Sequence, residues 1–557
     1  MQDRLVFALR AAGAALAATL FLTGCEEIVY RDREPFSQPL DASSGFLGYY
    51  TPTTRQTNCG NCHAEKQAEW LGTKHANAWT DLQASGHAQD FCNSCHTTNE
   101  AGNLVAVAAG FSAVQDSVYY DVQCESCHGP GVNHLAGPET NQLLASIAVD
   151  TGITNGCGEC HTGAHDPFVD EWVQSPHGYA SSYVAEGVRD PCANCHEGRR
   201  ALGVTFAGMD PRLSALVAVK GTYLEANDPI DAEHVQPITC AVCHDPHSAS
   251  KEGQLRREVG EAELTQLCVS CHRREGAPEP SHAGRRGPHA AQGLIVIDEE
   301  AGWKPSGWPY TERLLPTHSI NERGCAACHV TPFTINDASG NFVKNYTGHL
   351  FAAIPCIDQA TGEPIRNGTC SLDQRYFGGC TVSGCHGSAE AARTAFEVLE
   401  ARMDYLTDQL WADTDGDAVM ETTDRGLLPK VLAQAVAANN LNALNLYDTS
   451  VTDAERSIWN AQLAASDNRL YWFSFKIQGQ NSCNPVSTSS SDKCPGTLRS
   501  NTGHRSSGGG VHNPFFLEAL LTETIKAIQA KYAVAPDRPV DLTVHAAPPR
   551  GVRTASR

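Results

Sequence analysis

Basic residues and long apolar runs are both scarce in this chain of 557 residues. Lys and Arg together number 41 against 63 Asp and Glu, so the formal net charge is -22 at pH 7. A surface this acidic argues against nucleic acid as a partner and favours basic proteins or metal ions. Beyond residue 22, no stretch reaches the roughly 18 consecutive apolar residues of a membrane span, so no later segment is expected to cross a bilayer.

Regular periodic segments are scarce as well. The first two thirds of the chain are full of Gly, Pro, Asn and Asp and contain few long periodic runs. We therefore predict a mainly α fold with short helices, extensive loops and little β structure. A helical C-terminal domain is expected over 388–535, with helices near 427–446, 453–478 and 514–531. It begins with an apolar stripe of helical spacing at Ala392, Phe396, Leu399, Met403, Leu406 and Leu410.

Cysteine and histidine, in contrast, are abundant, with 23 of each. Two thiols three positions apart can each add to a vinyl group of one haem, and a histidine directly after them can ligate its iron. Zinc knuckles and redox dithiols do not require a histidine after every cysteine pair. The pattern therefore predicts a multihaem cytochrome c. Motifs 1 to 8, in chain order, are Cys59/Cys62/His63, Cys92/Cys95/His96, Cys124/Cys127/His128, Cys157/Cys160/His161, Cys192/Cys195/His196, Cys240/Cys243/His244, Cys268/Cys271/His272 and Cys325/Cys328/His329.

A ninth motif is irregular. Cys380 and Cys385 are separated by four residues, and His386 follows directly. This spacing resembles one that small sulfate-reducer cytochromes tolerate, and it favours a ninth haem. The alternative is that both cysteines form disulfides, which would leave eight haems.

Fourteen histidines remain outside the nine motifs. A second histidine on each iron suits an electron carrier, because six-coordinate iron changes oxidation state with little reorganisation and excludes substrate. An enzyme would need at least one open position. We predict nine distal ligands, enough for every iron: His75, His134, His177, His234, His247, His289, His318, His349 and His512.

The start of the chain has the pattern of an export signal. Arg4 and Arg10 accompany a short apolar run that ends at Leu22-Thr23-Gly24-Cys25, which resembles a bacterial lipoprotein signal. We predict removal of residues 1–24 and lipidation of Cys25; the alternative is a plain signal peptide with an incidental cysteine. In the lipoproteins that it resembles, Asp after the cysteine favours the inner membrane. Glu26 therefore favours the outer membrane, with the protein on its periplasmic or cell-surface side.

Four cysteines belong to no motif and lie as two local pairs. They are Cys356 with Cys370 and Cys483 with Cys494, 14 and 11 residues apart. An oxidising compartment permits disulfides, so we predict that both pairs are bridged.

An internal repeat divides the haem-binding part. Motif 1 reads CGNCH and is followed by Trp70 and His75, and motif 4 reads CGECH and is followed by Trp172 and His177. We predict a duplicated three-haem unit; the alternative is repeated motifs without a repeated fold. The expected organisation is a signal peptide at 1–24, a linker at 25–55, a three-haem unit at 56–150, a second unit with the seventh haem at 151–290, haems 8 and 9 at 291–387, the helical domain at 388–535 and a disordered tail at 536–557.

Three strings resemble known families. CGNCHAEKQAEWLGTKHANAW, with CNSCHTTN and CESCHGPGVNH, resembles the tetrahaem cytochrome that accepts electrons from hydroxylamine oxidoreductase. ITCAVCHDPHSAS followed by QLCVSCH resembles the doubled-CxxCH family, and GGGVHNPFFLEALL at 508–521 resembles the hydroxylamine oxidoreductase and nitrite reductase superfamily. These resemblances imply stacked haem pairs, an electron-transfer role and a distal-ligand role for His512. Catalytic relatives commonly carry CxxCK at the active haem, and no motif here does.

Acidic residues near the start of the helical domain have calcium-loop spacing. Asp413, Asp415, Asp417 and Asp424 occupy positions 1, 3, 5 and 12 of a loop that resembles a dockerin half-loop. Ala418 replaces the usual glycine at position 6. Calcium is therefore one interpretation, and a solvated acidic turn is the other.

Together these features predict an electron-transfer protein and not an enzyme. It would conduct electrons through bis-His haems across or outside the bacterial envelope, with redox proteins or extracellular acceptors as partners. One alternative is a haem-based oxidoreductase of small nitrogen or sulfur oxyanions. Another is a subunit of a cytochrome filament or of a porin-cytochrome conduit.

Overall fold

The computed structural model describes most of residues 38–545. The longer segments outside this description are 1–37, 207–231, 279–287, 465–509 and 546–557, with shorter gaps elsewhere. Cys25, His234, Cys385, Asp417, Cys483 and Cys494 therefore lie outside the described residues.

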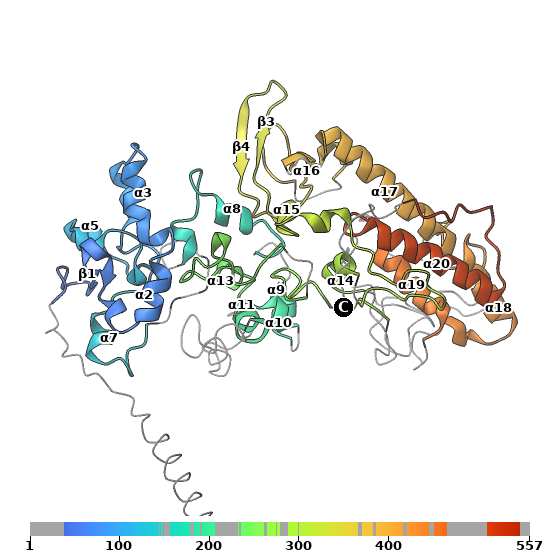
Figure 1. The fold of residues 1–557 in the computed structure, drawn as a ribbon, viewed down its shortest axis with the longest axis horizontal. Helices are drawn as coiled ribbons and strands as arrows, with labels where there is room; N and C mark the ends of the chain where they lie inside the picture. The colour runs from blue at the N-terminus through green and yellow to red at the C-terminus, as the bar shows by residue number, and fades with distance from the viewer. Residues whose placement is uncertain are drawn as a thin grey trace, which may run out of the picture.

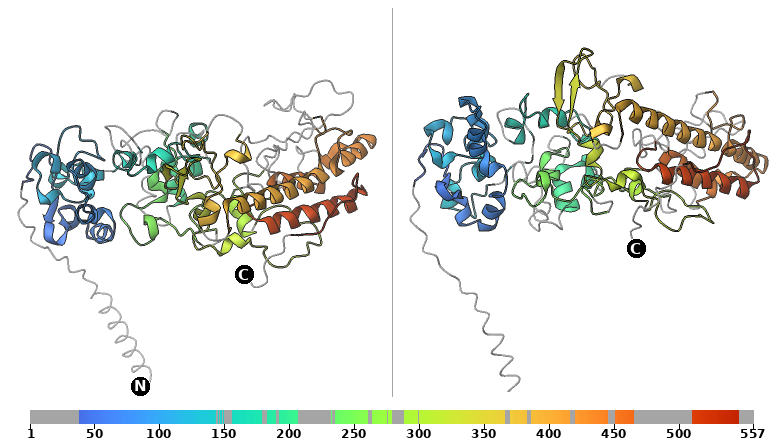
Figure 2. Two further views of the ribbon diagram at one scale, coloured as in Figure 1. Left: turned by 90° about the horizontal axis from the view of Figure 1, so that it is seen from above. Right: turned by 45° about the horizontal axis from the view of Figure 1, so that its top comes forward.

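The molecule is elongated, with the N-terminal unit at one end and a helical bundle at the other (Figures 1 and 2). The described residues are mostly short helices and loops with two small antiparallel sheets, as the sequence predicts. Within the described part of the chain, no helix is long and apolar enough to cross a membrane.

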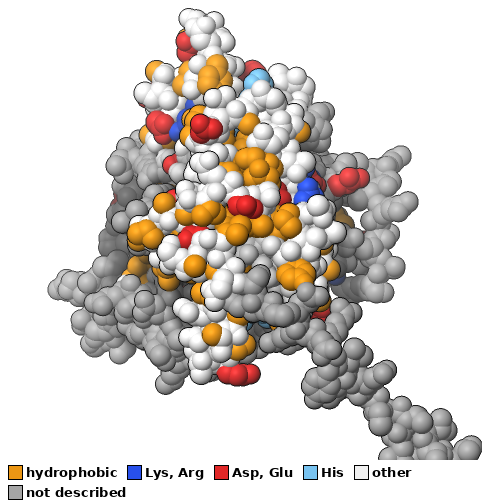
Figure 3. All heavy atoms as spheres, turned by 90° about the vertical axis from the view of Figure 1, so that its left-hand side faces the viewer, with side chains coloured by type: hydrophobic (Ala, Val, Ile, Leu, Met, Phe, Trp, Pro, Cys, Tyr) orange, Lys and Arg blue, Asp and Glu red, His pale blue; other side chains and the backbone are white. Residues whose placement is uncertain are grey.

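The N-terminal unit packs around a small aromatic core. Phe46 and Tyr119 are fully buried there, and the Tyr119 hydroxyl donates to the Phe46 carbonyl at 2.9 Å. Its outer face shows scattered apolar side chains among polar ones (Figure 3). The elements of this unit are β1 (Tyr49–Thr51), β2 (Gln56–Thr57), α2 (Ala64–Trp70), α3 (Ala78–Ala84), α4 (Asn93–His96), α5 (Phe111–Val114), α6 (Cys124–His128) and α7 (Val132–Ala136).

The middle of the molecule consists of short helices, many of which coincide with the motifs. A twisted hairpin projects from this region (Figure 1), with Phe333 opposite Tyr346 and Ile335 opposite Lys344. The elements are α8 (Phe168–Trp172), α9 (Tyr183–Gly187), α10 (Ala193–His196), α11 (Gly198–Arg200), α13 (Cys240–Cys243), α14 (Gln292–Ile297), α15 (Ala326–His329), β3 (Phe333–Asn336), β4 (Phe342–Tyr346) and α16 (Gly379–Val382).

The C-terminal bundle contains the largest hydrophobic core. Its helices are α17 (Ala389–Leu410), α18 (Leu427–Ala437), α19 (Asp453–Ala464) and α20 (Pro514–Tyr532). They begin at the predicted positions, but α18 ends at Ala437 and not near residue 446. The Ser388 side chain accepts a hydrogen bond from the Ala391 amide and caps α17. The stripe residues Met403, Leu406 and Leu410 are fully buried against α18, α19 and α20. The expected continuation of α19 from residue 465 to residue 478 lies outside the described residues.

The first part of the predicted disordered tail differs from expectation. Residues 536–545 lie along α17 and α20, with Leu542 and Val544 packed against the bundle core. The Arg402 guanidinium donates to the carbonyls of Asp541 and Thr543, at 3.2 and 2.8 Å. A charged side chain in the middle of α17 thus holds a segment whose composition alone predicted disorder.

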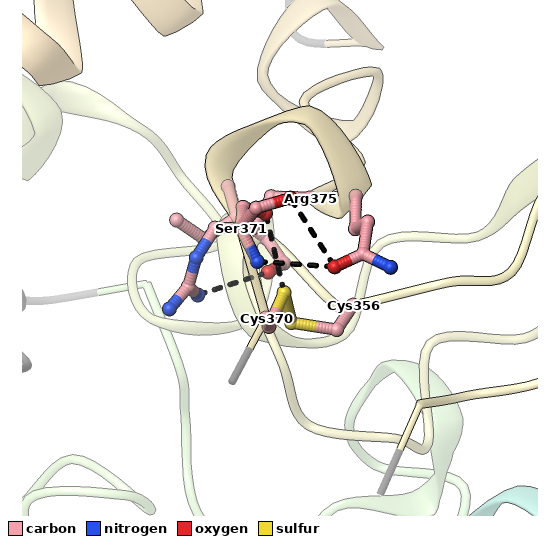
Figure 4. The surroundings of a disulfide bond; sticks show 6 residues. Cys356, Cys370, Ser371 and Arg375 are labelled. Carbon is pink, nitrogen blue, oxygen red and sulfur yellow. Dashed lines mark hydrogen bonds between the residues drawn. A yellow bond between two sulfur atoms is a disulfide. The ribbon is translucent and has the colours of Figure 1, made fainter. Parts of the chain in front are cut away.

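One of the two predicted disulfides falls within the described residues. Cys356 and Cys370 are bonded, with their Cα atoms 6.1 Å apart (Figure 4). Next to the bridge, Ser371 begins a short turn in which its amide donates to Gln374 Oε1 at 3.1 Å. The bridge therefore closes a loop beside the β3–β4 hairpin.

Candidate haem-binding sites

Each of the eight regular motifs is a single helical turn that brings its three reactive side chains together. In motif 1 the His63 amide donates to the Cys59 carbonyl at 2.9 Å, and His161 and Cys157 in motif 4 repeat this bond at the same distance. The same bond closes motifs 5 to 8 at 2.9–3.1 Å. One turn thus places both thiols on one side and the imidazole directly after them, as attachment of a single haem requires.

Eight of the nine motif histidines face a second histidine. The centres of the paired rings are 6.0–6.5 Å apart, and all eight partners are predicted distal ligands. The pairs, motif histidine first, are His63 with His134, His128 with His247, His161 with His75, His196 with His289, His244 with His349, His272 with His177, His329 with His512 and His386 with His318.

This spacing fits one iron between each pair of rings. A metal-imidazole bond of roughly 2.0 Å on each side, plus roughly 1.1 Å from nitrogen to ring centre, separates two such centres by roughly 6.2 Å. Directly packed aromatic rings also have centres roughly 4.5–7 Å apart, so it is the recurrence of this spacing at eight motifs that favours an iron between the rings. The residues present therefore fit a six-coordinate haem c at eight motifs.

Burial keeps several of these imidazoles in the neutral form that ligates metal. It lowers the pKa of His75 and His349 to about 4, and that of His177 to about 3. A neutral ring offers a lone pair at Nε2, whereas a protonated ring offers none. Metal binding at these sites therefore does not have to compete with protons at neutral pH.

Motif 2 is the exception. The Nδ1 of His96 is hydrogen-bonded to the Ala78 carbonyl at 2.8 Å, and no second imidazole faces its ring among the described residues. His234, the predicted ligand left over by the eight pairs, lies outside the description. Phe91, directly before this motif, is 78% exposed, so motif 2 lies at the protein surface.

The two three-motif segments make equivalent contacts. The Trp70 indole donates to the Val122 carbonyl, two residues before motif 3, and the Trp172 indole donates to the Ile238 carbonyl, two residues before motif 6. These distances are 3.0 and 2.9 Å. The histidine that follows each tryptophan then faces the first motif of the next segment, since His75 pairs with His161 and His177 with His272.

Sulfur contacts between motifs give their order in space. The first cysteines of motifs 1 and 3, Cys59 and Cys124, are in hydrogen-bonding contact, as are Cys157 and Cys240 of motifs 4 and 6. Cys268 and Cys325 repeat this contact between motifs 7 and 8. The pairing of motifs 7 and 8 therefore repeats that of motifs 1 and 3 and of motifs 4 and 6.

Second cysteines link each unit to the next. Cys95 of motif 2 contacts Cys160 of motif 4, and Cys195 of motif 5 contacts Cys271 of motif 7. Cys127 lies close enough to Cys157 to interact electrostatically, so motif 3 neighbours motif 4. Cys243 relates to Cys268 in the same way, so motif 6 neighbours motif 7. The order is therefore 1–3–4–6–7–8, with motif 2 beside motif 4 and motif 5 beside motif 7.

Three of the predicted attachment cysteines differ from the others in exposure. Cys62, Cys127 and Cys328, the second cysteines of motifs 1, 3 and 8, are exposed, whereas the other motif cysteines that the structure describes are partly buried. The motif pattern gives no reason to expect its two cysteines to differ in exposure, but in these three motifs they do. In these three motifs the first cysteine packs against a cysteine of a neighbouring motif, which covers it. A thioether bond needs the sulfur at the vinyl edge of a haem and not inside the protein core, so Cys62, Cys127 and Cys328 stay predicted attachment sites at the surface.

Sequence reasoning missed the pairing of motifs 7 and 8 because their segment lacks a middle motif. It also lacks the Trp-x-x-x-x-His string that marks the two three-motif segments. The remaining signal was the pairing of motifs 7 and 8 at a separation of 57 residues between their first cysteines. That separation is close to the 65 residues between Cys59 and Cys124.

The string GVHNP holds His512 in place through its neighbours. Asn513 is fully buried and donates to the carbonyls of Ile295 and Leu314 at 2.9 and 2.6 Å, while its Oδ1 caps α20 by accepting from the Phe516 amide. Pro514 occupies the first turn, where no amide hydrogen is needed. His512 thus faces His329, and the Val511 carbonyl accepts from His318, the partner of His386 in motif 9. Motifs 8 and 9 are therefore neighbours.

The acidic loop brings three of its four predicted residues together. Carboxylate oxygens of Asp413, Asp415 and Asp424 lie within 4.8 Å of one another, and Asp417 lies outside the description. Asp424 accepts hydrogen bonds from the Trp411 indole, the Thr414 hydroxyl and the Glu421 amide. These bonds give Asp424 a structural role in the turn whether or not a cation binds.

Comparisons with known proteins match the two N-terminal resemblances. Residues 58–129 match the family described as cytochrome c554 and c-prime, and residues 234–277 match the doubled CXXCH motif family. The resemblance of residues 508–521 to the hydroxylamine oxidoreductase superfamily stays a prediction.

Two curated relatives match parts of the chain. The multiheme cytochrome MtrA of Shewanella baltica strain OS185 is 24% identical over 256 residues, 43% of this chain and 66% of the relative. The C-type polyheme cytochrome OmcC of Geobacter sulfurreducens is 28% identical over 176 residues, 29% of this chain and 21% of the relative. The chain thus spans less than two thirds of the length of either relative. A solved structure, the outer cell wall cytochrome OcwA, aligns with 87% of this chain and 100% of its own at TM-score 0.47 and 16% identity.

Proposed function

We propose that this chain, a multihaem c-type cytochrome, conducts electrons along its length through haems that are held by paired histidines. The observation that carries the proposal is the series of neighbouring sulfurs from motif 1 to motif 8. Contacts join motifs 1 and 3, 4 and 6, and 7 and 8, and electrostatic proximity of Cys127 to Cys157 and of Cys243 to Cys268 links these three pairs. Haem c supplies the one-electron redox chemistry when bound. The contacting cysteines would hold the vinyl edges of successive haems side by side, and the histidine pairs would close both axial positions against substrate.

The proposed cofactor set is nine haems, one for each motif. His386 of the irregular motif faces His318 at 6.5 Å, which is the geometry of the regular motifs. This pairing supports attachment at Cys380 and Cys385, although Cys385 itself lies outside the description. The proposed ligands of the remaining motif are His96 and, by elimination, His234.

The proposed location is the bacterial envelope, with export, lipidation at Cys25 and a position at the outer membrane. The support is the signal pattern of the sequence and the presence of a disulfide at Cys356 and Cys370. Partners would be redox proteins, extracellular acceptors or an outer-membrane porin. Labelling with a clickable fatty acid tests the anchor, and no label in the wild type, or equal label in Cys25→Ala, would contradict it.

Electron redistribution inside the purified holoprotein tests conduction. A substoichiometric reductant is mixed with the oxidised protein, and samples are frozen at increasing times for EPR. If the haems form one conducting series, every ferric signal reaches its equilibrium intensity together in the earliest sample. Some signals could instead equilibrate only through collisions between protein molecules, at a rate proportional to protein concentration. That result would contradict a continuous path within one molecule.

A second candidate function follows from motif 2. Its His96 lacks a facing imidazole among the described residues, and the motif lies at the surface. An open iron there would suit a reductase of small nitrogen or sulfur oxyanions. A high-spin ferric signal that shifts on addition of cyanide or nitrite supports this function, and an entirely low-spin spectrum that neither ligand changes excludes it.

Calcium at the acidic loop belongs to the same proposal as a structural ion. Its support is the convergence of Asp413, Asp415 and Asp424. A chelator should lower the melting temperature of the wild type but not that of Asp415→Asn. Equal melting curves of the wild type with and without chelator would contradict the calcium site and indicate a solvated acidic turn.

A further inference from the structure

Carboxylates lie behind the imidazoles of two neighbouring motifs. His161, the motif histidine of motif 4, donates from Nδ1 to Asp166 Oδ2 at 2.5 Å. His247, which faces motif 3, has its Nδ1 3.3 Å from Asp245 Oδ1. In both cases Nε2 is the nitrogen left to face the paired imidazole.

A third carboxylate reaches its imidazole through a hydroxyl group. His349, which faces motif 6, has its Nδ1 3.0 Å from Thr347 Oγ1, and Thr347 Oγ1 donates to Glu171 Oε2 at 2.8 Å. Glu171 is 1% exposed and also accepts from the amides of Thr347 and His349 at 2.6 and 2.8 Å. The relay therefore runs from a buried carboxylate to the ring of a proposed iron ligand.

Other imidazoles have backbone carbonyls as acceptors. These include the motif histidines of motifs 3 and 6, His128 and His244, which are hydrogen-bonded through Nδ1 to the carbonyls of Leu143 and Gly253. His134 at motif 1, His96 at motif 2 and His329 at motif 8 are hydrogen-bonded through Nδ1 to the backbone carbonyls of Asn141, Ala78 and Phe351. These distances are 2.7–2.9 Å. Carbonyl oxygens are neutral acceptors, whereas Asp166, Asp245 and Glu171 can carry a full negative charge.

The acceptor of the second ring nitrogen tunes the metal that the first nitrogen binds. A carboxylate makes the imidazole a stronger donor to iron, and its negative charge favours the ferric state, which holds one more positive charge than the ferrous state. Both effects make the one-electron reduction of ferric to ferrous iron less favourable. Motifs 3, 4 and 6 are consecutive in the series 1–3–4–6–7–8, so the effect falls on adjacent positions.

We infer that Asp166, Asp245 and the Glu171–Thr347 relay are positioning residues that set the lowest reduction potentials at the centre of the haem series. This inference rests on the haem ligation proposed above for His161, His247 and His349. Asp166 has the largest effect because it contacts the ring directly. Asp245 has the smallest, because Arg256 lies 3.6 Å from its other oxygen and offsets its charge. In a partly reduced protein, electrons therefore reside at the two ends, where partners exchange them.

Redox titration of the holoprotein, followed optically and by EPR, tests the inference. Asp166→Asn keeps the shape of the side chain and removes its charge. The midpoint potential of one component of the titration should rise by at least about 59 mV, which corresponds to a tenfold change in the ferric-to-ferrous ratio for one electron. Asp170→Asn is the matched control, because Asp170 lies in the same segment and accepts from the Gly163 amide at 2.6 Å, not from an imidazole.

Equal shifts in the two variants, or no shift in Asp166→Asn, would overturn the inference. If Asp166→Asn removes the low-spin signal of one haem, the potential of that haem cannot be compared with the wild type. In that case the Glu171–Thr347 relay provides the test: Thr347→Val should raise the reduction potential of one haem, and Thr347→Ser should restore the wild-type value. No rise in Thr347→Val would then overturn the inference. Failure of the proposed ligation looks different, because a low-spin signal would be missing already in the wild type.

Discussion

Single histidines decide whether each iron is closed or open in this protein. A motif histidine is placed by the one-turn geometry of its own motif, but its partner comes from elsewhere: His75 is 86 residues from His161, and His512 is 183 from His329. Burial lowers the pKa of His75, which keeps its ring neutral and suits metal ligation. Removal of a partner should therefore change one haem and leave the others intact.

Replacement of His177 by alanine tests this independence. The haem of motif 7 should change from low to high spin, because its sixth ligand is lost while His272 and both cysteines remain. EPR should show one new high-spin signal for each protein molecule. The control is His165→Ala, since His165 is exposed in the same unit. A spectrum unchanged in His177→Ala would contradict the proposed pairing.

Glu125, between the two cysteines of motif 3, should make stability depend on pH. Burial raises its pKa to about 7 from the ordinary value of 4.5, although its carboxylate accepts from the amides of Leu47, Gly48 and Gly131. Folding then takes up a proton between these two pH values. This contribution to stability is fully present below pH 4.5 and is lost as the pH rises through 7, by an amount of about 3 kcal/mol.

Denaturant titrations of the holoprotein at several pH values measure this loss. Glu125→Gln should remove the decrease in the free energy of unfolding between pH 5 and 7.5. If the slope in the variant equalled that of the wild type, other groups would be responsible.

Among the helices, α20 links the bundle to the haem series. Its cap residue, Asn513, ties α14 and the segment at Leu314 to the helix start, and a positive φ at Gly510 precedes it. A Cβ at Gly510 would lie 2.8 Å from Met403 Cγ in α17, so the approach requires glycine. The bundle therefore acts as a support that delivers His512 and Val511 to motifs 8 and 9.

Asn513→Ala should destabilise the protein by about 2–4 kcal/mol, because it removes a helix cap and leaves two buried carbonyls without donors. It should also alter the EPR signal of one haem, since His512 loses its fixed position. Thermal unfolding and EPR measure the two effects. Asn442→Ala, at an exposed position of the same bundle, should change stability by less than about 0.5 kcal/mol. Equal effects of both substitutions would exclude the linking role.

The stability of the whole molecule depends on how many haems attach, because much of the described chain between the motifs is loop. Intact-protein mass should show nine haem additions, and Cys385→Ser should weaken or remove only the ninth. A mass with eight additions in the wild type would assign Cys380 and Cys385 to other bonds. Thiol counting on the denatured, unreduced protein should find no free cysteine, whether Cys380 and Cys385 hold a ninth haem or form disulfides.

Local sequence determined the haem motifs, the scarcity of strands and the helices of the C-terminal bundle. The reason is that these features depend on residues close together in the chain. The two cysteines of a regular motif are three positions apart and the histidine follows directly, and the apolar stripe from Ala392 to Leu410 has helical spacing. Composition misjudged residues 536–545, since the bonds from Arg402 that order them come from a distant helix.

Only the tertiary structure decided which histidine faces which motif, and in what order the motifs meet. A distal ligand is selected by distance in space, and nine candidates of the same residue type cannot be assigned to irons from their chain positions. The carboxylates of Asp166, Asp245 and Glu171 were invisible for the same reason, because an acidic residue acts on an imidazole only where the fold brings the two within hydrogen-bonding reach. Sequence thus determined that the chain carries haem, and the fold decided how the haem sites connect.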